Sequence, residues 1–104
     1  MIWLKKDEDA WDLSFIQSYN LDNSPALFLV ITGSLRKTCA KYGDRGYRFA
    51  LLEAGHLAQN LMLLGEALHL KSVALGAFFD RALADFLHLD FLDEKPLYIL
   101  GLGA

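Results

Sequence analysis

Cysteine is nearly absent from this chain of 104 residues, which contains Cys39 alone. A single cysteine excludes an intrachain disulfide and a zinc site made of several cysteines. The N-terminal residues do not follow the basic-then-apolar order of a signal peptide, and no apolar run approaches the ~20 residues of a membrane span. We therefore expect a cytoplasmic protein without a membrane partner.

An excess of charge of one sign is also missing. The formal net charge is −3 with both signs mixed along the chain, so nothing indicates a nucleic-acid partner. The sequence contains neither GxGxxG nor a P-loop, which excludes those phosphate-binding motifs. His69 and His88 lie far from His56 along the chain, and no carboxylate joins His56 on its helix face at ligand spacing. We therefore expect no bound metal.

Apolar residues, by contrast, are abundant and make up 54% of the chain, above the ~45–50% of typical domains. The length allows one domain, and a chain this small buries only roughly 60–70% of its unfolded surface. The excess therefore favours a partner that covers apolar surface, and a tightly packed small core is the alternative.

The pattern of apolar and polar residues predicts an α+β domain. The expected order is a loose helix around 9–20, a strand at 26–32, a short helix at 35–42, a long helix at 47–69, a strand at 72–77, a helix at 79–89 and a strand at 97–102. This order predicts a small sheet of about three strands packed on a long central apolar helix. The strand at 26–32, a continuous apolar run, should be buried on both faces.

Turn and capping residues suggest where the two neighbouring helices end and begin. Ser34 can cap the short helix at its start, and Gly43 can end it as a C′ residue. Asp44 is then a reasonable N-cap for the long helix, although Gly46 weakens the first turn.

The long helix at 47–69 would exceed ~30 Å and has leucines around its whole circumference, which is typical of a buried helix. Ala50, Ala54 and Ala58 recur every fourth residue beside Gly55, and such a stripe lets another helix approach closely. We therefore expect a homodimer formed through this helix.

His56, Gln59 and Asn60 lie within about one turn of this otherwise apolar helix. Polar groups in such a setting need buried partners or a ligand. A histidine hydrogen-bonded inside the core is one interpretation, and polar residues that specify register at a helix–helix interface are another. Both are structural roles, and we favour them over binding chemistry.

A polar cluster precedes the long helix. Lys41 and Tyr42 can donate or shuttle protons if they are buried, whereas the alternative is a helix-end lysine beside a packed tyrosine. Arg45, Tyr47 and Arg48 can surround an anion, but ion pairs with nearby carboxylates or a solvated face explain them better.

Three segments together resemble a known family. KYGDRGYRFALLEAGHLAQNL (41–61), LKSVALGAFFD (70–80) and KPLYILGLG (95–103) are similar to the C-terminal half of the SagB-type dehydrogenases. These enzymes belong to the nitroreductase superfamily of FMN-dependent oxidoreductases. The resemblance covers about 24–103 and implies a nitroreductase-like fold of half length.

The resemblance also implies site residues, a cofactor and a partner. Lys41 and Tyr42 stand where azoline-oxidising relatives carry a Lys-Tyr pair implicated in catalysis. Gly76 or Ala77, followed by Phe78, stands where a backbone N–H approaches the flavin N5 in this superfamily. The family implies FMN, an obligate homodimer with flavin at the interface, and an azoline-type peptide or a nitro or quinone compound as substrate.

The chain departs from the family in its N-terminal part. The superfamily's domain is about twice this length, and its N-terminal part carries an arginine- and serine-rich motif that holds the FMN phosphate. No such motif precedes Ser24. The alternatives are therefore a truncated, non-catalytic dimeric scaffold or one half of a split flavoenzyme. Met1 at the start favours a natural short protein over a fragment.

Overall fold

The computed structural model describes residues 2–6 and 27–103, with side chains described in the second range. The helix expected around 9–20 lies outside the described residues. Of the helices that the structure does describe, none is long and apolar enough to cross a membrane.

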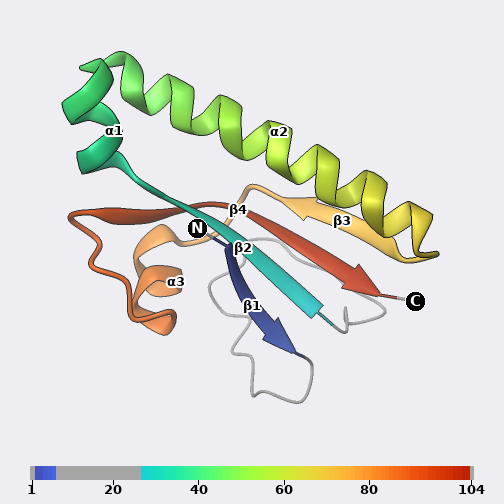
Figure 1. The fold of residues 1–104 in the computed structure, drawn as a ribbon. Helices are drawn as coiled ribbons and strands as arrows, with labels where there is room; N and C mark the ends of the chain where they lie inside the picture. Colours follow the sequence, from blue (N-terminus) through green and yellow to red (C-terminus); the bar gives the residue numbers. More distant parts are fainter. Residues whose placement is uncertain (1, 7–26, 104) are drawn as a thin grey trace.

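An antiparallel sheet of four strands forms the centre of the fold (Figure 1). In spatial order the strands are β1 (Ile2–Lys6), β2 (Leu27–Ser34), β4 (Glu94–Gly103) and β3 (Lys71–Leu75). The sequence predicted three of these strands. It predicted no strand before residue 26, whereas β1 pairs with β2 along its full length, with Ile2 opposite Ile31.

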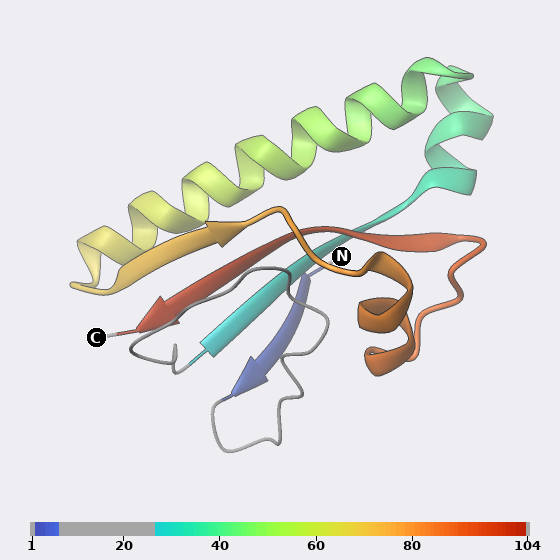
Figure 2. The same cartoon turned by 180° about the vertical axis from the view of Figure 1, so that it is seen from behind.

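Helices cover both faces of this sheet (Figures 1 and 2). The helices are α1 (Leu35–Tyr42), α2 (Arg45–Ala67) and α3 (Asp80–Phe86). The bounds of α1 are those predicted, and α2 begins and ends two residues earlier than predicted. The α+β fold class is confirmed.

The ends of α1 and α2 follow the prediction only in part. Gly43 ends α1 as predicted, and its φ of 68° with ψ of −147° is a conformation that favours glycine, although it is not the αL conformation. Asp44 has helical dihedral angles and forms no side-chain cap, so its predicted capping role is wrong. Ser34 is extended but does not cap α1 either, because its hydroxyl donates to Oδ1 of Asp93 at 2.6 Å.

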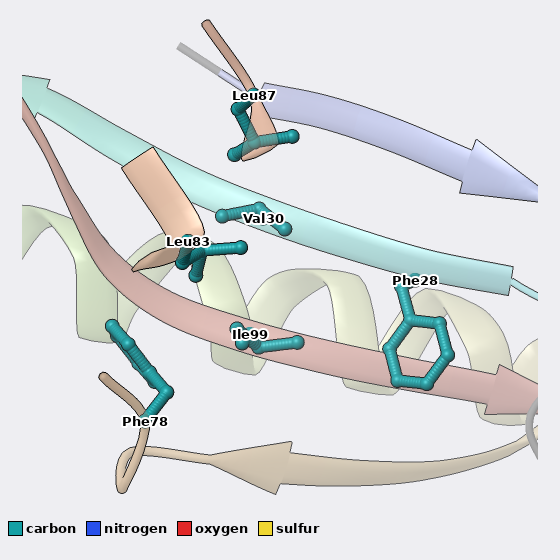
Figure 3. Close-up of a cluster of buried hydrophobic side chains, with 6 residues drawn as sticks. All are labelled: Phe28, Val30, Phe78, Leu83, Leu87 and Ile99. Atoms are coloured by element: carbon teal, nitrogen blue, oxygen red, sulfur yellow. The ribbon is translucent and has the colours of Figure 1, made fainter. Parts of the chain in front are cut away.

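Alternating side chains of β2 build two hydrophobic clusters, one on each face. Phe28 and Val30 face α3, and Leu29 and Ile31 face α2. The α3-side cluster consists of Phe28, Val30, Phe78, Leu83, Leu87 and Ile99 (Figure 3). The α2-side cluster consists of Leu29, Ile31, Ala54, Ala58, Leu100 and Leu102. The prediction that the strand at 26–32 is buried on both faces is confirmed.

The long helix buries only one side within a single chain. Its buried residues are small: Gly46, Ala50, Ala54, Ala58 and Gly65. Gly46 lies against α1, and the other four let the helix lie close to the sheet. The alanine stripe therefore faces the chain's own strands and not another helix. Leu57, Leu61 and Met62 are partly buried against the α2-side cluster, whereas Leu52, Leu63 and Leu64 are each more than half exposed. The expectation of a helix buried all round is therefore wrong for one chain alone.

Candidate active site

A hollow of about 210 Å³ opens where β3 ends and the chain turns toward α3. It is lined by residues of all three helices, of β4 and of the β3–α3 connection: Leu35, Tyr47, Leu51, Gly76, Phe78, Asp80, Lys95, Pro96 and Leu97. The fold thus brings Gly76 and Phe78, two of the three predicted cofactor-binding residues, into one concave surface. Ala77 between them is exposed.

Gly76 leaves the wall of this hollow open. A Cβ added there would meet only Cε1 of Tyr98, at the ordinary contact distance of 3.9 Å. Packing within the chain therefore does not require glycine at this position. Its absent side chain leaves the backbone free for close approach by a ligand.

Phe78 belongs both to the wall of the hollow and to the hydrophobic core. Its ring is 8% exposed and belongs to the α3-side cluster, together with Leu83 and Ile99 (Figure 3). Burial of this large aromatic side chain holds the β3–α3 connection in place. Phe78 thus supports the backbone that Gly76 and Ala77 expose.

Lys95 supplies a positive charge that the sequence analysis did not single out. Its Nζ donates a hydrogen bond to the carbonyl oxygen of Phe91 at 2.8 Å and lies 3.6 Å from the centroid of the Phe91 ring. The guanidinium of Arg81 lies 5.1 Å from the same ring. Two cations therefore gather around one aromatic side chain beside the hollow. The only sequence signal for Lys95 is its place at the start of the segment KPLYILGLG.

Lys41 and Tyr42 lie at the end of α1 and do not line the hollow. Both side chains are exposed, so the burial that would favour proton transfer is absent in a single chain. Nζ of Lys41 lies 5.2 Å from the Tyr42 ring centroid, and that ring packs edge-on against Phe49 at 5.1 Å. The pair is thus fixed at the α1–α2 corner, from which Tyr47 reaches the hollow.

A second hollow of about 300 Å³ lies between α1, α2 and the end of β2. Leu97 lines both hollows, because the register between β2 and β4 shifts there: Ile31 faces Tyr98 and Thr32 faces Pro96. The hydroxyls on its walls already have internal partners. Thr32 donates to the Glu94 carboxylate, and Thr38 donates to the Ser34 carbonyl at 3.0 Å. This hollow therefore offers fewer open polar groups than its volume suggests.

The other polar residues that the sequence singled out lie on the surface. Arg45 and Arg48 are exposed and line neither hollow. His56, Gln59 and Asn60 are exposed as well, so the interpretation of a histidine bonded inside the chain's own core is wrong. Within the described ranges, no group of three or more potential metal-binding side chains comes together.

Comparison with known proteins gives this geometry a context. The profile of the Nitroreductase family matches residues 3–104. MJ1384 of Methanocaldococcus jannaschii, whose name places it among the nitroreductases, is 36% identical over 77 residues, or 74% of this chain. The microcin B17-processing protein McbC of Escherichia coli is 33% identical over 79 residues, or 76% of this chain.

Solved structures share the fold at similar coverage. The E. coli microcin synthetase complex McbBCD with truncated pro-MccB17 bound contains a chain that matches 77% of this one, with a TM-score of 0.74 and 32% identity. A nitroreductase-type structure from Anabaena variabilis matches 76% of this chain, with a TM-score of 0.70 and 38% identity.

The relatives are much longer than this chain. The matched region spans 37% of MJ1384 and 29% of McbC. In the two solved structures it spans 30% and 16% of the matched chain.

Proposed function

This chain belongs to the nitroreductase family, and on that premise we propose that it forms the flavin-contacting part of an FMN-dependent oxidoreductase. The observation that carries the proposal is the hollow at the end of β3, where Gly76 and Phe78 meet. It coincides with the segment 70–80 that resembles the flavin-contacting segment of the family.

The residues present fit the ring of a flavin and not its phosphate. The open backbone at Gly76 and Ala77 offers N–H groups, and Phe78 and Leu97 offer apolar contact. Lys95 is the one cation among the residues that line the hollow. A flavin phosphate needs several donors or cations, so these must come from another chain or another segment.

The size of the hollow also indicates that another chain or segment completes the site. Its volume of about 210 Å³ is below the ~300–1,000 Å³ of most small-molecule sites. A second surface is therefore needed to enclose a cofactor, which supports a site at a homodimer interface. The exposed leucines of α2 support the same interface.

FMN would supply hydride or electron transfer in this site. The backbone N–H of Gly76 or Ala77 would orient the ring, and Lys95 would favour negative charge beside it. Lys41 and Tyr42 would lie beside a substrate that extends from the hollow toward the α1–α2 corner. They would accept the proton that an azoline ring loses on oxidation, or supply a proton to a nitro or quinone compound on reduction. We propose an azoline-type ring of a peptide as the substrate because of the Lys-Tyr pair and the similarity to McbC; nitro and quinone compounds are the alternative.

The first experiment is a visible absorption spectrum of the purified protein, before and after excess FMN, followed by gel filtration. A flavin band that stays with the protein supports the oxidoreductase proposal. A colourless dimer that ignores FMN contradicts it and favours a non-catalytic scaffold. Binding of FMN that appears only with a second, different chain favours a split enzyme. The cytoplasmic location expected from the single cysteine stays part of the proposal.

A further inference from the structure

Two cations beside the hollow share one aromatic partner. Nζ of Lys95, on the wall of the hollow, lies 3.6 Å from the centroid of the Phe91 ring, and the guanidinium carbon of Arg81 lies 5.1 Å from the same centroid. Their separation is therefore at most the sum of these two distances. The helix α3 and the connection that follows it lie together at one end of the sheet (Figures 1 and 2). The fold thus gathers two positive charges at the rim of the candidate site.

The carboxylates of the neighbouring turn are directed elsewhere. Oδ1 of Asp93 accepts the hydroxyl of Ser34 at 2.6 Å. The Glu94 carboxylate accepts the hydroxyl of Thr32, and Asp90 accepts a backbone N–H of its own turn. Within the part of the chain that the structure describes, neither of the two cations forms an ion pair. Both positive charges are therefore available to an anion from outside the chain.

Both cations keep N–H donors for a ligand. The ammonium group of Lys95 has three N–H donors, and one of them is used by the carbonyl oxygen of Phe91, at 2.8 Å. The guanidinium of Arg81 has five N–H donors, and contact with the face of a ring uses none of them. The ring attracts both cations through its negative face. Phe91 is therefore a positioning residue that holds the two donor groups near each other.

The balance of charge at the rim selects a carboxylate as the ligand. Asp80 also lines the hollow and is exposed, so the rim has two positive charges and one negative charge. The remaining positive charge matches a single carboxylate. A phosphate monoester carries about −1.5 to −2 at neutral pH and would leave the rim negative. A carboxylate can direct one oxygen to each cation, because a charge-assisted hydrogen bond spans roughly 2.7–2.9 Å.

We propose that Arg81 and Lys95 bind a carboxylate of the substrate, next to the ring that reacts at the flavin. The identity of the anion as part of a substrate rests on the proposed function, and it narrows that substrate to an acidic one. Lys95 lines the same hollow as Gly76 and Phe78, so an anion bound here lies beside the flavin-facing backbone. Azoline, nitro and quinone groups carry no net negative charge, so the carboxylate belongs to a neighbouring part of the substrate.

A matched pair of ligands tests the site without any turnover. Thiazole-4-carboxylate and thiazole-4-carboxamide both contain the ring of an oxidised azoline and have nearly the same shape, but only the first is charged. The protein should bind the acid at least about fivefold more tightly than the amide. Titrations followed by amide NMR spectra, with and without FMN, measure both affinities. Equal affinities, or no binding of the acid at millimolar concentration, would overturn the inference.

Removal of single charges locates the site. Arg81→Gln and Lys95→Gln should each lose most of the preference for the acid, whereas Lys95→Arg keeps the charge and should retain it. Phe91→Leu keeps both cations but removes the ring that positions them, so its preference should also fall. Arg36→Gln on α1 is the control, because it removes the same charge from an exposed residue that lines neither hollow. A preference that survives in both glutamine variants of the site would overturn the assignment.

Riboflavin and FMN separate a substrate site from a phosphate site, because these flavins share the ring and differ by the phosphate. If Arg81→Gln weakens the binding of FMN but not of riboflavin, the cations hold the flavin phosphate and the inference is overturned. A protein that ignores both flavins yet prefers the acid supports the carboxylate site and contradicts the proposed function. A protein that binds FMN without preferring the acid overturns this inference alone.

Discussion

Gly46 shows how a single residue allows two helices to come into close contact. It is buried at the start of α2, and an added Cβ would lie 2.8 Å from backbone atoms of Thr38 and Cys39. The carbonyl carbon and oxygen of Thr38 and the amide nitrogen of Cys39 are backbone atoms, so they cannot move aside as a side chain does. The close contact between α1 and α2 therefore depends on a glycine at this position.

We expect Gly46→Ala to lower the free energy of unfolding by about 1–3 kcal/mol, because the extra methyl forces the α1–α2 corner apart. Urea unfolding followed by circular dichroism measures this. Gly55→Ala is the matched control: its Cβ position is open, and alanine favours the helix, so it should not destabilise the single chain. Equal losses in the two variants would contradict the steric explanation.

Ala77 provides a test of the flavin-facing backbone. If its N–H donates to a flavin nitrogen, Ala77→Pro removes the donor and should weaken FMN binding by about tenfold. Ala77→Ser keeps the N–H at the same exposed position and should bind FMN as the parent does. Fluorescence titration with FMN measures both. Unchanged affinity in the proline variant would rule out this N–H as a flavin contact.

At the scale of elements, α3 depends on tertiary contacts. A helix of seven residues is too short to be stable alone. It is held on the sheet by Leu83, which is fully buried, and by Leu87 just beyond its end, against Val30 and Ile99 (Figure 3). This docking also positions the β3–α3 connection that borders the hollow.

Leu83→Ala should therefore cost about 2–5 kcal/mol of unfolding free energy, from lost burial and a residual cavity. Leu92→Ala is the control. Leu92 is 81% exposed, so its truncation should change stability by less than about 0.5 kcal/mol. The same urea titration compares the two. If Leu83→Ala unfolds at the parent's midpoint, α3 is not held by this cluster.

At the scale of the whole molecule, the exposed side of α2 predicts that stability depends on concentration. A dimer that covers Leu52 and Leu63 removes apolar surface from water, so the thermal midpoint should rise with protein concentration. Leu63→Glu should abolish this rise by placing a charge on the exposed side of α2. Leu92→Glu makes the same change at an exposed leucine outside α2 and should preserve it. A midpoint that does not move with concentration in the parent protein would contradict dimerisation in this range.

The sequence predicted only those residues of the candidate site that belong to a recognisable local segment. Gly76 and Phe78 were expected at a flavin-binding backbone from the segment 70–80, and the fold does bring them to one hollow. Tyr47 was singled out as part of a possible anion site, and the fold instead makes it a wall of this hollow. Lys95 was missed because its relation to the hollow depends on the pairing of β4 with strands distant in sequence.

The sequence by itself determined the local elements and the family. Continuous apolar character identified β2 as buried on both faces, and Gly43 marked the end of α1 because only glycine adopts its conformation freely. Three separated segments were enough to indicate the nitroreductase fold.

Only the tertiary structure decided which sides of these elements meet. Leucines around α2 suggested a fully buried helix, but small residues proved to be the sheet-facing side because they allow the closest approach. The strand β1 was missed because its place at the sheet edge depends on pairing with β2 more than twenty residues away. Periodicity reports which residues share a side of an element. Which side is buried depends on long-range packing, which no local pattern contains.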